Sequence, residues 1–94
     1  MEPSDLQQRP TPEGLPPLLA AMWYLQRGDW KRAHEIAQAL DTSDGAWVHA
    51  HLHRYEGDLA NADYWYRRAG QRRSDLPLEA EWQEIVRELW KRAA

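Results

Sequence analysis

A short phrase occurs twice in this chain: a glycine, an aspartate, an apolar residue and, five positions after the glycine, an alanine. The two copies are Gly28-Asp29-Trp30-Lys31-Arg32-Ala33 and Gly57-Asp58-Leu59-Ala60-Asn61-Ala62. Glycine readily adopts the left-handed conformation that ends a helix, and aspartate is a good N-cap for the next helix. Because apolar residues at helical spacing flank each copy, the phrase predicts two antiparallel helical hairpins.

The apolar periodicity predicts five helices and no strand, which makes the fold class all-α. The expected ranges are Leu15–Arg27, Asp29–Leu40, Ala46–Glu56, Asp58–Gly70 and a last helix that has Pro77 in its first turn and Lys91 and Arg92 near its end. We expect two antiparallel hairpins and a C-terminal helix that caps them. Residues 1–14 hold three prolines and little to bury, so they predict a disordered tail before a single helical domain at 15–94.

The residues around each turn resemble the tetratricopeptide repeat (TPR), in which two antiparallel helices meet at such a turn and pack through small residues. An alanine stands seven positions before each glycine and another five positions after it: Ala21, Ala33, Ala50 and Ala62. The glycines at 28 and 57 are 29 residues apart, against about 34 in the standard repeat. The runs Trp47–Asp58 and Tyr64–Ala69 are also similar to a small family of uncharacterised bacterial proteins.

The resemblance implies a non-enzymatic interaction or assembly module whose groove is lined by the first helix of each hairpin. We expect an exposed aromatic and cationic strip that binds a peptide or protein, helped by two arginines of the fourth helix; the residues are Trp47, His51, Arg54, Tyr55, Arg67 and Arg68. The alternative is that the last helix or a second subunit buries this strip. Two hairpins are fewer than the three repeats that a solenoid needs, so we also expect a homodimer.

His49 and His53 lie one helical turn apart on the same face, as zinc-binding pairs do, so metal binding is an alternative function. A catalytic zinc site needs a third protein ligand, for which Glu35 and Glu56 are candidates. His34-Glu35 resembles the start of a metalloprotease helix, but Gln38 stands where the second histidine should be. The competing interpretation places both imidazoles inside the hairpin as hydrogen-bonded core residues, with no metal and no cofactor.

Arg67, Arg68, Arg72 and Arg73 form a basic patch next to aromatic residues, so nucleic-acid binding is a second alternative. A net charge of −3 argues against it. The chain has no cysteine, and its N-terminal residues lack the pattern of a signal peptide. Together with the short apolar runs, which exclude a membrane span, these features predict a cytoplasmic protein. We expect no enzymatic activity, because the sequence has no glycine-rich phosphate loop and no serine or threonine placed as a nucleophile with an evident base.

Overall fold

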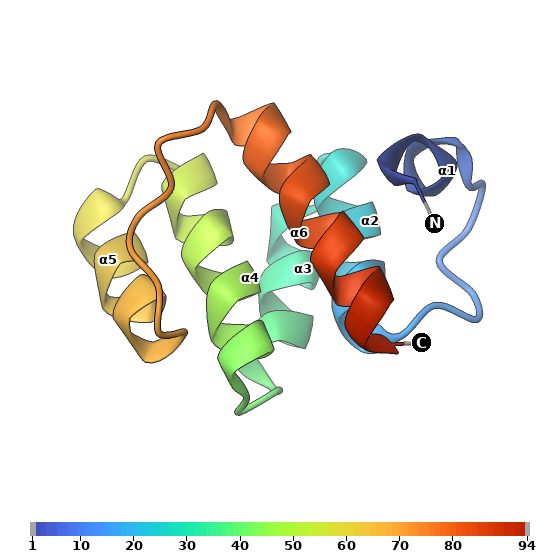
Figure 1. The fold of residues 1–94 in the computed structure, drawn as a ribbon. Coiled ribbons are helices and arrows are strands. Elements are labelled where there is room, and N and C mark those ends of the chain that lie inside the picture. The colour runs from blue at the N-terminus through green and yellow to red at the C-terminus, as the bar shows by residue number, and fades with distance from the viewer. Residues whose placement is uncertain (1, 94) are drawn as a thin grey trace.

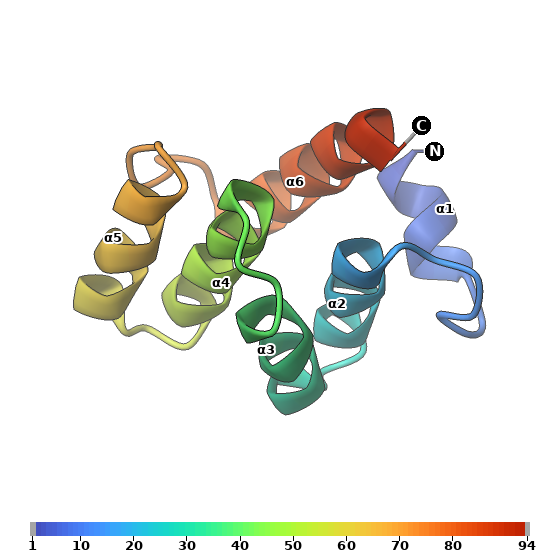
Figure 2. The ribbon, with the colours of Figure 1, turned by 90° about the horizontal axis from the view of Figure 1, so that it is seen from below.

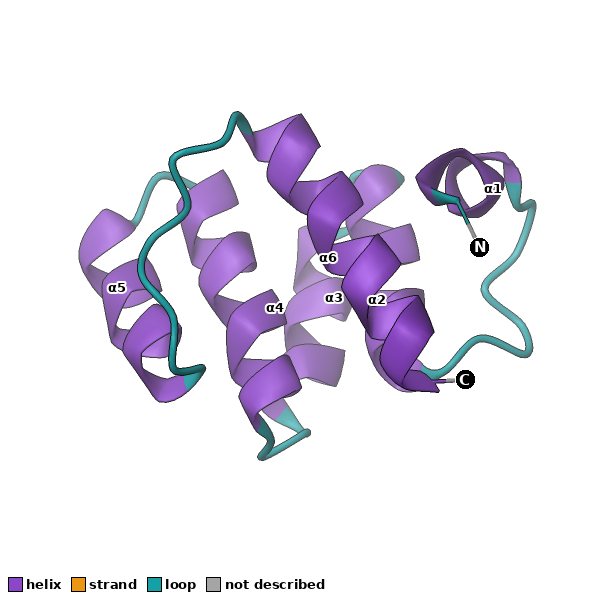
Figure 3. Ribbon diagram, viewed as in Figure 1, coloured by secondary structure: helices purple, strands orange, loops and turns teal. Residues whose placement is uncertain are grey.

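The structure is a computed structural model that describes residues 2–93 of the chain. These residues form six α-helices and no strand (Figures 1 and 3), so the predicted all-α class is confirmed. The helices are α1 (Pro3–Gln8), α2 (Pro17–Gln26), α3 (Trp30–Gln38), α4 (Ser43–Tyr55), α5 (Leu59–Arg68) and α6 (Leu78–Ala93). None of these helices combines the length and the apolar character that a membrane span requires.

The two Gly-Asp dipeptides form turns of the same geometry. Gly28 and Gly57 have left-handed backbones, with φ of +83° and +88°. The Asp29 side chain accepts a hydrogen bond from the Arg32 amide at 3.1 Å, and Asp58 caps α5 in the same way. The expected role of each dipeptide, ending one helix and starting the next, is therefore confirmed.

Replacing Gly57 by alanine will lower the free energy of unfolding by about 1 kcal/mol, because a residue with a Cβ resists the left-handed conformation. A Cβ at this position would meet no atom within 4 Å, so the cost is conformational. At Gly45, by contrast, a Cβ would lie 2.2 Å from the Leu40 carbonyl oxygen. Urea denaturation should therefore show a larger loss for Gly45→Ala, and an equal loss in the two variants would contradict this explanation.

Helix α4 runs through the middle of the fold, where the nine residues Gly45–His53 are all buried. It packs against α3 and α5 and also contacts α2 and α6. Alanines that are completely buried allow the helices to approach closely; they are Ala21, Ala33, Ala50 and Ala62. These are the small residues seven positions before and five positions after the turn glycines, so their predicted place inside the fold is confirmed.

Helix α6 crosses over α2 and α4 (Figure 2) and covers that side of the core. The Trp82 indole N–H donates to the Met22 carbonyl oxygen at 3.1 Å, which ties α6 to α2. Beneath α6, Trp47 is only 3% exposed and His51 only 1%. The exposed strip expected from the sequence is therefore not available at these two residues, because the last helix of the chain lies on it.

The first fourteen residues differ from the disordered tail that their composition predicts. They contain α1, which lies beside α2 and α6 (Figures 1 and 2), and Leu6 is completely buried in the core. The Trp23 indole N–H donates to the Arg9 carbonyl oxygen at 2.8 Å and holds the segment on α2. Buried Leu6 and Pro3, together with hydrogen bonds from Trp23 and Arg27 to the Arg9 carbonyl oxygen, thus hold a proline-rich segment on the helices. Residues 1 and 94 of the predicted ranges lie outside the described residues.

Candidate functional site

The residues predicted to bind a partner fall into two groups in the structure. Trp47 and His51 lie in the core, and Arg54 is mostly buried beside them, with its guanidinium 3.0 Å from a Glu81 oxygen. The exposed members are Tyr55, Arg67 and Arg68. They come from the ends of two different helices, so the predicted set does not form one continuous groove on α4.

Nearby carboxylates partly neutralise the basic patch that the sequence shows between positions 67 and 73. Arg68 lies 3.4 Å from Asp41, and Arg73 makes two hydrogen bonds to the Asp63 carboxylate at 2.8 and 2.7 Å. The Arg73 guanidinium also holds the pKa of Asp63 below its usual value. This pairing lowers the positive charge available to a phosphate backbone, so the nucleic-acid hypothesis gains no support and stays a prediction.

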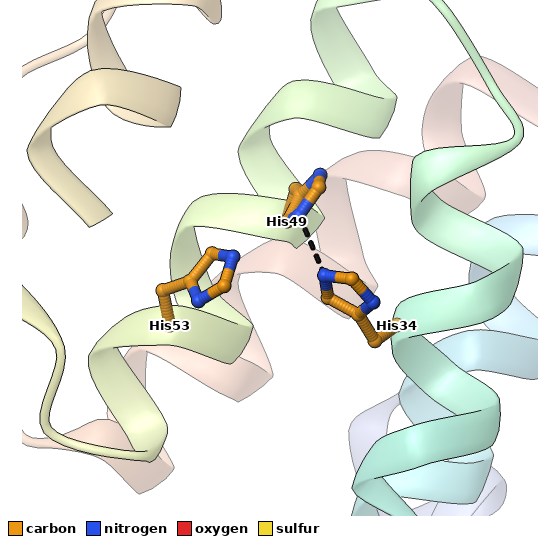
Figure 4. A group of neighbouring side chains, drawn as sticks. All are labelled: His34, His49 and His53. Carbon is orange, nitrogen blue, oxygen red and sulfur yellow. Dashed lines mark hydrogen bonds between the residues drawn. The ribbon is translucent and has the colours of Figure 1, made fainter. Parts of the chain in front are cut away.

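The structure brings three histidines together between α3 and α4. His34 extends from α3, and His49 and His53 extend from successive turns of α4, so that the rings point toward one another (Figure 4). Each histidine offers one ring nitrogen, and these nitrogens all lie within 4.8 Å of one another. The Nε2 atoms of His34 and His49 are 2.8 Å apart. The structure thus adds a third imidazole, that of His34, to the predicted pair His49 and His53.

The surroundings of the cluster favour the neutral form of two of its imidazoles, those of His49 and His34. Burial, reinforced by the neighbouring rings of His34 and His53, lowers the pKa of His49 to about 4 from an ordinary value of 6.5. Burial and the proximity of His53 also lower the pKa of His34. A neutral imidazole keeps a lone pair on one nitrogen, which is the form that binds a metal ion.

Other side chains hold the three rings in place. Glu56 lies one turn after His53, with a carboxylate oxygen 2.7 Å from the imidazole Nδ1, so Nε2 of His53 faces the cluster. The His34 ring stacks on Trp30 with centroids 4.8 Å apart, and the His49 ring stacks on Trp65 at 3.9 Å. A carboxylate that orients a histidine from its far nitrogen, and flanking rings that limit rotation, are typical of metal-binding histidines.

The separations within the cluster suit a tetrahedral ion. Zinc–nitrogen bonds of about 2.0–2.1 Å place two ligand atoms about 3.3 Å apart, which lies between the 2.8 Å that separates His34 from His49 and the 4.8 Å limit of the group. His53, Glu56 and Asp58 form a second group of neighbouring ligand atoms. Its two acidic residues are exposed, and the Asp58 carboxylate already caps α5. The three-histidine cluster is therefore the better candidate.

His34 is the member of the cluster that the sequence pattern does not identify. It stands 15 positions before His49, and the spacing of two residues on different helices carries no metal-binding signature. The packing of α3 on α4 brings His34 to His49, and this packing is a contact between helices that residue spacing does not predict. The sequence offers Glu35 and Glu56 as candidates for the third ligand. Glu56 contacts the far nitrogen of His53, Nδ1, and Glu35 is exposed.

A second buried polar cluster ties α4, α5 and α6 together around Glu81. This carboxylate is completely buried, and its oxygens lie 2.6 Å from Nδ1 of His51 and 3.0 Å from Nη1 of Arg54. The Tyr66 hydroxyl donates to the second oxygen. Burial alone would raise the pKa of Glu81, but the hydrogen bonds from His51, Tyr66 and Arg54 outweigh burial and lower it. We assign this cluster a structural role, because its hydrogen bonds to a completely buried carboxylate join three helices.

Comparison with models of protein families, with curated proteins and with solved structures found no match to this chain. The resemblance to tetratricopeptide repeats and the similarity to a group of bacterial proteins therefore stay predictions. The function of the chain has to be inferred from the geometry of the site.

Proposed function

We propose that this chain binds one transition-metal ion, zinc in the first place, through His34, His49 and His53. The observation that supports the proposal is the convergence of three imidazoles from two helices, with ring nitrogens that all lie within 4.8 Å of one another. Imidazole nitrogens suit Zn²⁺, Cu²⁺ and Ni²⁺, whereas Mg²⁺ and Ca²⁺ prefer oxygen ligands. Three protein ligands also leave a fourth position of a tetrahedral ion open to water or to a small molecule.

An ion at this site joins α3 to the central helix α4. Because the unfolded chain cannot assemble the three ligands, ion binding stabilises the folded state. At a free zinc concentration 100 times the dissociation constant, the gain is about 2.7 kcal/mol. We propose binding and metal-dependent stability as the function, in line with the non-enzymatic role expected from the sequence.

Zinc titration of the full chain, stripped beforehand with a chelator, tests the proposal. We expect one zinc ion per chain, and an affinity that falls at least about 100-fold in His34→Ala, because losing a ligand costs more than losing the residue that orients one. His34 is half-buried, so this variant should fold, and circular dichroism checks that it does. Glu35→Gln is the matched control, because Glu35 is the exposed neighbour of His34. Absent binding, or equal affinity in both variants, would contradict the proposal.

Glu56→Gln will weaken zinc binding about 10–100-fold, because it weakens the hydrogen bond that orients the His53 ring. The same titration measures this loss, and Glu35→Gln again serves as the control. Zinc affinity unchanged in Glu56→Gln would show that the carboxylate does not support the ion.

A second candidate is the interaction or assembly role, with α2–α3 and α4–α5 as two TPR-like hairpins and α6 as their cap. Large apolar side chains exposed near α5 favour it: Tyr55, Leu59 and Tyr64 are 49%, 42% and 44% exposed. Exposed aromatic residues are enriched at protein interfaces. Light scattering tests the homodimer, and co-purification tests a partner; a monomer that retains no partner would remove this candidate.

A further inference from the structure

A cavity of about 410 Å³ lies beside the histidine cluster, between the end of α3, the start of α4 and the outer part of α5. This volume is in the range of small-molecule sites. The lining residues that matter here are His49, Trp65, Arg68, Asp41, Thr42 and Ser43. His49 therefore belongs both to the proposed metal site and to the wall of the cavity.

The two ring nitrogens of His49 face different surroundings. Nε2 lies against His34, whereas no hydrogen bond within residues 2–93 engages Nδ1. His49 is only 4% exposed. Within the described residues, every side-chain nitrogen or oxygen that is fully buried has a hydrogen-bond partner, so an unpaired Nδ1 cannot be fully buried. Nδ1 therefore keeps some accessible surface, and the side chain that carries it lines the cavity.

Arg68 supplies a positive charge to the same cavity. Its guanidinium lies 5.1 Å above the Trp65 ring, and Trp65 stacks on His49, so cation, indole and imidazole follow one another along the wall. The partner of Arg68, Asp41, is 3.4 Å away with a side chain that is 96% exposed. Such an exposed ion pair contributes little, so a ligand can replace Asp41. The N-terminus of the 13-residue helix α4, at Ser43, adds the positive end of a helix dipole.

We propose that this cavity binds a small oxyanion, a carboxylate or a tetrahedral anion, between Nδ1–H of His49 and the guanidinium of Arg68. The proposal rests on the proposed metal function in one respect. A zinc ion on Nε2 leaves the imidazole proton on Nδ1, where it donates into the cavity. Zinc then raises the affinity for the anion, and the anion raises the affinity for zinc by the same factor.

Calorimetric titration with sulfate and with succinate, at low ionic strength and constant pH, tests the proposal on the zinc-loaded and the chelator-treated full chain. We expect at least one of these probes to bind, and the zinc-loaded form to bind it about fivefold more tightly or better. Binding of sulfate alone assigns a tetrahedral anion, and binding of succinate alone assigns a carboxylate. Arg68→Gln should weaken binding about tenfold or more.

Arg67→Gln is the matched control, because Arg67 is exposed on the same helix but does not line the cavity. Asp41→Asn should bind the anion at least as tightly as the unchanged chain, because it removes the competing carboxylate. Zinc binding without anion binding, or equal losses in the two arginine variants, overturns this inference and leaves the metal site standing. Equal anion affinity with and without zinc overturns the coupling, whereas failure of zinc itself to bind contradicts the proposed function.

Discussion

Replacing Glu81 by alanine will lower the free energy of unfolding by about 3–5 kcal/mol, a large share of the stability of a domain of this size. The carboxylate is completely buried and accepts hydrogen bonds from Arg54, from Tyr66 and from the His51 ring. Removing it takes the acceptor from the Tyr66 hydroxyl and from the buried His51 ring, and it leaves Arg54 with its bond to the Leu76 carbonyl oxygen alone. Desolvated polar groups without partners are among the few causes of losses this large.

Urea denaturation at neutral pH measures this loss. Glu84→Ala is the control, because Glu84 is exposed on the same helix, and its replacement should change stability by no more than about 0.5 kcal/mol. If Glu81→Ala does not fold, Tyr66→Phe removes a single donor to the same carboxylate and should cost about 1–2 kcal/mol. Equal losses in the two glutamate variants would show that the buried network does not hold α6 in place.

Acid will destabilise the metal-free protein through His49. The pKa of His49 is about 4 in the folded chain, against an ordinary value of 6.5. Between pH 4 and pH 6.5, His49 is therefore protonated in the unfolded chain and neutral in the folded chain. The contribution of His49 to the free energy of unfolding is fully present above pH 6.5 and is lost as the pH falls toward 4. At 1.36 kcal/mol per pKa unit, the loss is about 2 kcal/mol by pH 5 and about 3 kcal/mol by pH 4.

Urea denaturation in the presence of a chelator, repeated from pH 7 to pH 4, measures this contribution. His49→Gln is the comparison, because glutamine keeps a polar side chain and does not titrate. Other acidic groups titrate in both proteins, so the difference between the two curves isolates His49. Parallel curves would contradict the assignment of a buried, neutral imidazole at this position.

Much of the fold follows from local sequence signals. Gly28 and Gly57 end helices with left-handed backbones, and the aspartates after them cap the next helices, as their residue types predict. Five helices lie near their predicted ranges because apolar residues recur at helical spacing. The order around Leu6 could not be predicted in this way, since one buried leucine produces no periodic pattern.

The buried glutamate, the third histidine and the covered strip depend on contacts between helices, which local sequence patterns do not reveal. A glutamate near the start of a helix normally stays in solvent, where it favours the helix dipole. The partners that bury Glu81 come from α4 and α5, so its own helix does not reveal them. His34 has no signature of its own and becomes a candidate ligand when α3 packs on α4. The sequence leaves open whether the strip around Trp47 is exposed or covered by the last helix, and the path of α6 decides in favour of burial.

The most direct test of the metal site is a crystal structure of the zinc-loaded chain, with an anomalous difference map recorded at the zinc absorption edge. We expect one peak among His34, His49 and His53, about 2.0–2.1 Å from one nitrogen of each ring. A zinc ion bound elsewhere, or three rings that keep the hydrogen bond between His34 and His49 in the presence of excess zinc, would contradict it.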